Sequence, residues 1–218
     1  MAERKVRIGI IGCGGIANGK HMPSLKKVPE AEMVAFCDLI EERAIKAAKD
    51  YGTADAKVYT DYKELLKDES IDVCYVLTPN RSHAPISIDA MKAGKHVLCE
   101  KPLALNAEEG RQMVQAARKN GCLLMEAMVS TLNPNFIAAA SRISEIAPVR
   151  QYSSYFCQYS SKFEALKRGE VGTAFKPGTA GALRDIGVYT LYPLVALFGK
   201  PSSIKGKLAT YQTPEGET

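Results

Sequence analysis

The chain has 218 residues, of which 46% are hydrophobic and 24% charged, and its formal net charge at pH 7 is +5. These proportions exclude a wholly disordered chain, and no apolar run approaches the roughly 20 residues that a membrane-spanning helix needs. Tryptophan is absent and the basic residues are scattered, so we expect no nucleic-acid partner and no membrane partner. The first residues lack a signal-peptide pattern, which favours a cytoplasmic location.

The six cysteines, at positions 13, 37, 74, 99, 122 and 157, contain no C-x-x-C pair. Five of them lie in or beside apolar runs, where a cysteine behaves as a small hydrophobic residue. We therefore expect reduced thiols in the cytosol, with neither a disulfide framework nor a metal site.

The first 127 residues alternate strand and helix signals. Short apolar runs predict strands at Val6–Ile11, Met33–Cys37, Ile71–Leu77, Val97–Cys99 and Cys122–Met125. Helical patterns lie between them, at Glu41–Tyr51, Asp61–Lys67, Pro85–Ala93 and from the cap Asn106 to Gly121. Because the strand runs are almost continuously apolar, we expect a parallel sheet covered on both faces. The alternation predicts a doubly wound α/β domain over residues 1–127.

Residues 128–218 have a different rhythm, which predicts a partial α+β second domain. We expect helices at Pro134–Ile146 and Ala182–Phe198, and strands at Val149–Gln158 and Ile204–Tyr211. Two strands with one exposed face rarely stand alone, and an uncovered edge invites another chain. We therefore expect an open-faced sheet that is either truncated or completed by a partner, most simply in a homo-oligomer.

A glycine-rich segment directly follows the first strand and opens a helical segment. It reads Gly-Cys-Gly-Gly-Ile-Ala from Gly12 to Ala17, a variant of the dinucleotide-binding fingerprint. Gly12 permits the tight turn, Gly14 lets the main chain approach a pyrophosphate, and Ala17 lets helix and strand pack closely. Main-chain N–H groups at a helix start favour an anion. The residues expected to bind the cofactor here are Gly12, Cys13, Gly14, Gly15 and Ile16.

Asp38 ends the second strand, 26 residues after Gly12. A carboxylate at this position accepts hydrogen bonds from ribose hydroxyls and repels a 2′-phosphate, which favours NAD over NADP. Arg43 lies nearby and is able to meet a 2′-phosphate, so NADP stays possible. The alternative is that Asp38 only caps the following turn.

Glu100, Lys101 and Pro102 close a later strand. Ligands bind at the carboxyl ends of strands in a doubly wound sheet, so Lys101 is expected to face the active crevice. Taken alone, the motif is equally a surface Glu–Lys pair before a proline.

Four motifs in fixed order resemble the Gfo/Idh/MocA family of oxidoreductases, in particular its dihydrodiol and sugar dehydrogenase branch. They are Gly12–Ala17, Thr78-Pro79-Asn80-x-x-His83, the run from Ala93 to Pro102, and Asp185-Ile186-Gly187-Val188-Tyr189. The resemblance implies an N-terminal Rossmann domain and a longer second domain that frames the substrate and often mediates oligomers. It makes Lys101, Asp185 and Tyr189 catalytic, and it places Thr78, Asn80, His83, Glu100 and Lys101 around the cofactor.

Each of these residues also has a structural interpretation. Tyr189 fits the interior of an apolar helix, Asp185 fits a helix cap, and His83 fits a partner for a buried carbonyl. His21 and His96 are expected to be structural, and Glu126 has no assigned role.

The chemistry is consistent with the resemblance. Residues four apart share a helix face, so Asp185 and Tyr189 can point at one substrate. A tyrosine with a pKa of about 10 is a poor base, but a lysine ammonium nearby favours its phenolate. We therefore expect an NAD(P)-dependent dehydrogenase or reductase that moves hydride between nicotinamide and a hydroxyl carbon of a sugar, cyclic polyol or trans-dihydrodiol-like substrate. The alternatives are a truncated, non-catalytic nucleotide-binding or assembly protein and an NAD-retaining glycosidase.

Overall fold

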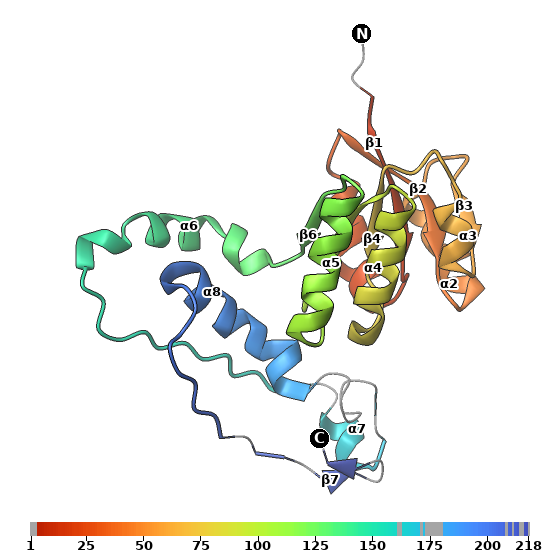
Figure 1. The fold of residues 1–218 in the computed structure, drawn as a ribbon. Coiled ribbons are helices and arrows are strands. Elements are labelled where there is room, and N and C mark those ends of the chain that lie inside the picture. The colour runs from red at the N-terminus through yellow and green to blue at the C-terminus, as the bar shows by residue number, and fades with distance from the viewer. Residues whose placement is uncertain are drawn as a thin grey trace. The chain divides into compact units, whose positions relative to one another are not determined.

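The computed structural model describes residues 4–160, 163–170, 172, 181–207, 209–210, 212–213 and 216–217. The chain divides into two compact units, Met1–Ala127 and Met128–Thr218, and each is described by itself (Figure 1).

The first unit is built on a six-stranded sheet in the order β3-β2-β1-β4-β5-β6, and every neighbouring pair is parallel. The strand order reverses between β1 and β4, which is the topological switch point of a doubly wound sheet. This confirms the predicted fold class. The strands are β1 (Val6–Ile11), β2 (Ala31–Cys37), β3 (Lys57–Tyr59), β4 (Val73–Val76), β5 (His96–Cys99) and β6 (Leu124–Glu126).

The sequence did not reveal β3. Its three residues pair with one neighbour only, at the edge of the sheet, and none of them is fully buried. An edge strand of this length carries no continuous apolar run, so the pattern that identified the other strands is missing.

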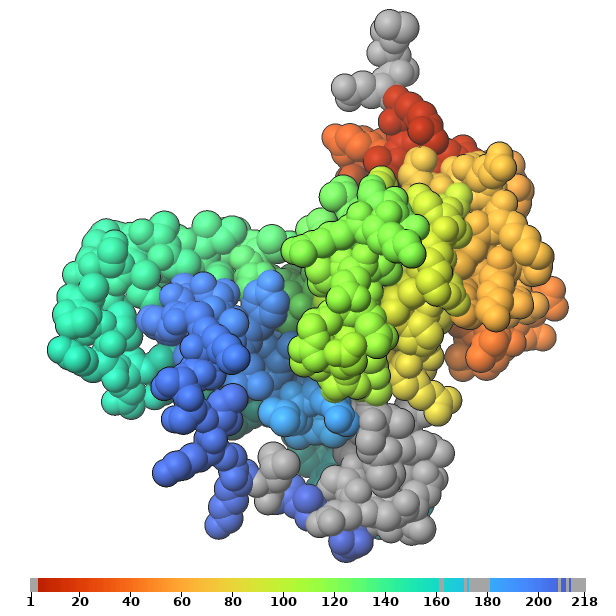
Figure 2. All heavy atoms as spheres, in the orientation of Figure 1, coloured from red at the N-terminus to blue at the C-terminus, as the bar shows by residue number. Residues whose placement is uncertain are grey.

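Helices cover both faces of this sheet. On one face, α4 and α5 run side by side, as the ribbon and the packed atoms both show (Figures 1 and 2). Side chains of α3, α4 and α5 share one buried cluster with β4, while those of η1, α1 and α2 share a second cluster. These elements are η1 (Ala17–His21), α1 (Met22–Leu25), α2 (Glu41–Tyr51), α3 (Tyr62–Leu66), η2 (Asn80–Ser82), α4 (His83–Lys92) and α5 (Ala107–Lys119).

Strand β4 explains why the apolar runs are continuous. Cys74 and Val76 enter the cluster on the α3–α5 face, whereas Tyr75 between them enters the cluster on the α1–α2 face. Alternate side chains of a strand point to opposite faces, so a strand that is covered on both sides needs apolar residues at every position.

The predicted helix starts have the expected caps. The Asn106 side chain accepts a hydrogen bond from the Glu109 amide at 2.9 Å, and Asp61 accepts one from the Lys63 amide at 2.9 Å. Both satisfy amides that have no acceptor within their own helix. No helix in the described ranges is long and apolar enough to cross a bilayer.

Four of the cysteines, Cys13, Cys37, Cys74 and Cys99, are buried in the first unit. Burial raises the pKa of each of these thiols to about 12. They are therefore protonated at neutral pH and pack as small apolar groups.

The second unit is largely helical where the structure describes it. The helices expected at Pro134–Ile146 and Ala182–Phe198 are present, the first as α6 followed by η4 and the second as η6 followed by α8. The elements are η3 (Val129–Leu132), α6 (Pro134–Ser141), η4 (Ile143–Ile146), α7 (Phe163–Lys167), η6 (Leu183–Gly187), α8 (Val188–Phe198), β7 (Gln212–Thr213) and β8 (Gly216–Glu217).

The prediction of two strands in this unit, Val149–Gln158 and Ile204–Tyr211, is wrong over their described residues. Residues 149–158 have no regular secondary structure, and neither do residues 204–207 and 209–210, while 208 and 211 lie outside the described residues. A strand is stable only when a neighbour completes its hydrogen bonds, and the described ranges supply no such neighbour to these segments. Among the described residues of the second unit, the only ladder is the short antiparallel pair of β7 and β8.

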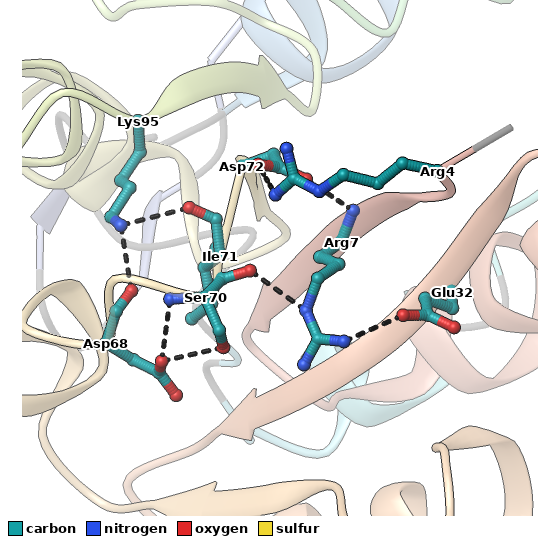
Figure 3. Close-up of polar contacts among 8 residues, drawn as sticks. All are labelled: Arg4, Arg7, Glu32, Asp68, Ser70, Ile71, Asp72 and Lys95. Atoms are coloured by element: carbon teal, nitrogen blue, oxygen red, sulfur yellow. Dashed lines mark hydrogen bonds and ion pairs between the residues drawn. The ribbon is translucent and has the colours of Figure 1, made fainter.

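At the amino-terminal edge of the first unit's sheet, charged side chains fix the loop that precedes β4. Lys95 is buried, and its ammonium donates to the carbonyls of Asp68 and Ile71 at 2.8 and 3.0 Å. Arg7 reaches the same loop from the other side, where its Nε donates to the Ser70 carbonyl at 3.0 Å (Figure 3). Its guanidinium also pairs with Glu32 on β2 at 2.9 Å.

We expect Lys95→Met to lower the free energy of unfolding by about 2 kcal/mol, because it leaves the buried Ile71 carbonyl without its donor and removes one of two donors from the Asp68 carbonyl. Urea unfolding followed by circular dichroism measures this change. The exposed Lys92 on α4 provides the control, and Lys92→Met should change stability by less than about 0.5 kcal/mol. Equal effects of the two substitutions would contradict the assigned role of Lys95.

Candidate active site

Residues that follow the parallel strands meet at the carboxyl edge of the sheet. Gly12 comes directly after β1, Asp38 after β2 and Glu100 after β5, while Thr78 lies two residues beyond β4. Glu126 is the last residue of β6. The sheet thus collects the predicted cofactor residues along the edge where doubly wound proteins bind ligands.

The fingerprint turn is held tightly against the end of β4. Gly12 has φ +98°, and a Cβ built on it would lie 2.8 Å from the carbonyl carbon and oxygen of Leu77. Glycine is the residue that meets both conditions. At Gly14 and Gly15, by contrast, a Cβ would have no described atom within 4 Å. The turn is therefore packed against protein at its first glycine and open at the next two.

Asn18 stabilises this turn, a role that the sequence analysis missed. Its side-chain amide donates to the carbonyl oxygens of Cys13 and Gly14 at 2.7 and 2.9 Å. These carbonyls are thereby held toward the helix, and the amides at the helix start have no acceptors within it. A polar residue one turn into the helix is the signal that could have identified it.

Asp38 connects the turn to the end of β2. Its Oδ2 accepts a hydrogen bond from the Cys13 amide at 2.9 Å, and its Oδ1 accepts one from the Ile40 amide at 2.9 Å. Asp38 therefore does cap the turn that follows β2, as the alternative interpretation predicts. A carboxylate has about four acceptor sites, so these two bonds leave capacity for ribose hydroxyls.

Thr78 and His83 lie in the loop after β4. The Thr78 hydroxyl oxygen is buried and has no hydrogen-bond partner among the described atoms, which suits a group that meets a ligand. Both ring nitrogens of His83 lie 2.8 Å from main-chain carbonyl oxygens, Nδ1 from Pro102 and Nε2 from Thr78. The carbonyl-partner interpretation of His83 describes this geometry, while Asn80 begins η2 and is half-buried.

The loop that carries Lys101 is fixed on both sides of that residue. Before it, the Lys101 amide donates to Glu100 Oε2 at 2.7 Å. After it, His83 holds the Pro102 carbonyl, and the Leu103 amide donates to Glu126 Oε1 at 2.8 Å. The Lys101–Pro102 peptide bond is cis, and Lys101 itself is half-buried. The main chain at Lys101 is therefore placed by two carboxylates at strand ends, Glu100 and Glu126, and by His83 at the start of α4.

Glu126, which had no assigned role, supports this loop. Its pKa is raised, first by burial and then by the nearby Glu100 carboxylate. Glu126 follows a strand as Asp38 and Glu100 do, and that position is the signal that could have indicated its role.

Asp185 and Tyr189 belong to the second unit. Asp185 lies in η6 and Tyr189 in α8, within one continuous helical stretch, and both are half-buried. The Tyr189 ring stacks on Phe156 with the ring centres 5.6 Å apart. The structure thus brings the candidate residues of the first unit together at the carboxyl edge of its sheet. Asp185 and Tyr189 lie in the second unit, which is described by itself.

The residues at the carboxyl edge fit a dinucleotide cofactor. The turn is open over Gly14 and Gly15, the Asp38 carboxylate retains acceptor capacity, and a buried hydroxyl at Thr78 has no protein partner. Gly14, Gly15 and Ile16 would hold the pyrophosphate, while Gly12 and Cys13, whose amides donate to Cys37 and Asp38, would shape the turn around it. Asp38 would hold the adenosine ribose.

We expect Glu126→Gln to stabilise the protein at about pH 7. The raised pKa means that ionisation of Glu126 opposes folding above that pKa, whereas below its unfolded value of about 4.5 both states are protonated and the effect vanishes. The glutamine oxygen still accepts from the Leu103 amide. Urea unfolding at about pH 4 and pH 7 measures the difference.

Glu108→Gln is the control of opposite sign, since Arg111 lowers the pKa of Glu108 and the ionised form therefore favours folding at neutral pH. A Glu126→Gln protein that is less stable than the wild type at neutral pH would contradict the assignment.

Known proteins of similar sequence include two sugar or polyol oxidoreductases. Scyllo-inositol 2-dehydrogenase (NADP(+)) IolU of Bacillus subtilis (strain 168) is 38% identical over 201 residues, which are 92% of this chain and 60% of that protein. The dTDP-3,4-didehydro-2,6-dideoxy-alpha-D-glucose 3-reductase of Streptomyces violaceoruber is 30% identical over 216 residues, 98% of this chain and 60% of that protein. The chain thus spans about three fifths of the length of these relatives.

A solved structure shows the same fold. The crystal structure of KijD10, a 3-ketoreductase from Actinomadura kijaniata in complex with NADP and TDP-benzene, has a TM-score of 0.72 and 27% identity, and the match covers 90% of this chain and 58% of that one. Residues 6–128 match the oxidoreductase family with an NAD-binding Rossmann fold. This match covers more than half of the 218 residues, and the chain therefore belongs to the Gfo/Idh/MocA family of oxidoreductases that its motifs resemble.

Proposed function

We propose that this chain is an NAD(P)-dependent oxidoreductase that moves hydride between nicotinamide and a hydroxyl carbon of a sugar, cyclic polyol or trans-dihydrodiol-like substrate. The observation that carries the proposal is the shared sheet edge: the open fingerprint turn follows β1 and the fixed Lys101 loop follows β5, with β4 between them. The names of the relatives support the substrate class, since they act on an inositol and on a deoxysugar nucleotide.

In this proposal residues 1–127 bind the cofactor and residues 128–218 contribute to substrate binding. Thr78, Asn80 and Glu100 line the cofactor together with the fingerprint turn, and His83 positions the loops around it. The homo-oligomer expected from a second-domain sheet stays a prediction, which the mass in solution tests. All six cysteines are unpaired, which suits the reducing cytoplasm where we place the protein.

The bound nicotinamide ring accepts or supplies the hydride. The main chain at Lys101 is fixed before and after it, and in this proposal its ammonium lies beside the reacting oxygen, where it stabilises negative charge. Tyr189 takes the hydroxyl proton during oxidation and returns it to the carbonyl oxygen during reduction. Asp185, four residues earlier, orients the substrate hydroxyls from the same helical stretch.

The Asp38 carboxylate predicts the cofactor preference. We expect NADH to bind in the micromolar range and NADPH about tenfold more weakly, because the carboxylate repels the 2′-phosphate. In Asp38→Asn this preference should shrink. Quenching of nucleotide fluorescence on titration measures both constants.

Asp50→Asn on α2 removes the same charge from the protein surface and should leave the ratio of the two constants unchanged. Tighter NADPH than NADH binding by the wild type would show that Asp38 does not set the preference.

The catalytic assignment predicts that Lys101→Ala and Tyr189→Phe each lower kcat by about 100-fold while the cofactor dissociation constant stays within about twofold. A panel of inositols, sugars and trans-diols, followed by nicotinamide absorbance, first identifies the substrate. Lys92→Ala, at an exposed position of α4, is the matched control for a lost lysine. Full activity of both site variants would refute the assignment, and a panel without any turnover, despite NADH binding, would refute the proposed function.

A further inference from the structure

A chain of three side chains joins the cofactor turn to the Lys101 loop. His21 ends η1, which begins at the fingerprint, and its Nε2 lies 2.7 Å from Glu100 Oε1. The other ring nitrogen, Nδ1, lies 2.6 Å from the hydroxyl of Tyr75 on β4. The His21 and Tyr75 rings also meet edge to face, with centroids 5.0 Å apart. His21 therefore has a defined partner at each nitrogen.

The hydrogen-bonding capacities of the partners assign the protons in this chain. A carboxylate only accepts, so the bond to Glu100 requires a hydrogen on His21 Nε2. Burial, with Glu100 and Cys99, raises the pKa of Tyr75, so its phenol keeps its proton and is able to donate to Nδ1. The neutral ring with hydrogen on Nε2 satisfies both bonds at once.

Burial distinguishes this chain from an ordinary surface pair. The side chains of His21 and Glu100 are 19% and 13% exposed, and Tyr75 is buried. Solvent therefore screens these contacts less than it screens an exposed pair, and three aligned bonds restrict the Glu100 carboxylate to one orientation.

The last hydrogen bond in this series of side chains indicates the role of the series. The second oxygen of Glu100 accepts from the main-chain amide of Lys101 at 2.7 Å. The sequence of bonds from Tyr75 through His21 and Glu100 thus reaches a peptide group. Such an arrangement fixes the main chain at Lys101.

We propose that His21, oriented by Tyr75, is a positioning residue that fixes the Glu100 carboxylate and, through it, the main chain at Lys101. Since η1 starts at the fingerprint turn, the same residue links the place of the cofactor to the place of the ammonium. The effect of this link on catalysis rests on the proposed function. The link itself is a feature of the protein structure and needs no cofactor or substrate.

The first test therefore needs no substrate. Amide hydrogen exchange of Lys101, measured by NMR on the full chain without cofactor, should be about tenfold faster in His21→Phe than in the wild type, because the Glu100 acceptor is no longer held in place. Tyr75→Phe removes a single hydroxyl and should accelerate exchange to a smaller extent. It also keeps the test decisive if His21→Phe does not fold.

Two controls remove similar groups elsewhere in the first unit. His96→Phe replaces an imidazole with a phenyl ring at the start of β5, and Tyr62→Phe removes a phenol hydroxyl that donates to Asp89. Neither should change Lys101 exchange. Unchanged exchange in both His21→Phe and Tyr75→Phe would overturn the proposal.

The nitrogen-15 spectrum of the His21 ring gives a second, independent readout. We expect hydrogen on Nε2 in the wild type, and a change in the Nδ1 resonance in Tyr75→Phe. Hydrogen on Nδ1 alone would overturn the proposal, since Glu100 would then face a bare nitrogen.

Activity separates this inference from the proposed function. With a substrate in hand, Tyr75→Phe and His21→Phe should lower kcat by about three- to tenfold while the NADH dissociation constant and KM stay within about twofold. A wild type without turnover, in which Lys101 exchange still depends on His21, would refute the function and leave the link intact. An active wild type whose variants match it in exchange and kcat would refute the link.

Discussion

The close approach of Gly12 to the end of β4 is the constraint on which the site depends. Its main chain packs where any side chain would collide with Leu77, and its positive φ turns the chain straight into η1. Because of that turn, the helix starts at the sheet edge, and His21 on the same helix lies beside Glu100. One glycine thus determines both the opening for a pyrophosphate and the contact that steadies the Lys101 loop.

The two edges of the sheet carry side chains of opposite charge that bind the main chain. At the amino-terminal edge, Lys95 and Arg7 bring charged groups to loop carbonyls and close the surface with side chains. At the carboxyl edge, Asp38, Glu100 and Glu126 accept hydrogen bonds from main-chain amides and leave the turn above Gly14 open. The side-chain contacts that stabilise the fold thus lie at the amino-terminal ends of the strands, and the proposed ligand site lies at their carboxyl ends.

The fold of the first unit could be predicted from sequence because its central strands are buried on both faces, which leaves unbroken apolar runs such as Met33–Cys37. The fingerprint and Lys101 were visible for a related reason, since they follow such runs directly. Glu126 was not assigned a role, and His21 was expected only to be structural, because each acts through contacts with distant segments that no local pattern records. Asn18 was missed although its contacts with Cys13 and Gly14 are local. The strand expected at Val149–Gln158 failed since alternation alone does not supply a pairing neighbour.

The distribution of thiols has a practical consequence. Four cysteines of the first unit are buried and protonated, whereas Cys157 in the second unit is exposed and Cys122 is only partly covered. A thiol-directed fluorophore at neutral pH will therefore react first with Cys157 and spare the cofactor turn, even though Cys13 is part of it. Exchanging Cys122 for serine leaves one addressable position, from which energy transfer to bound NADH can report the approach of one unit to the other.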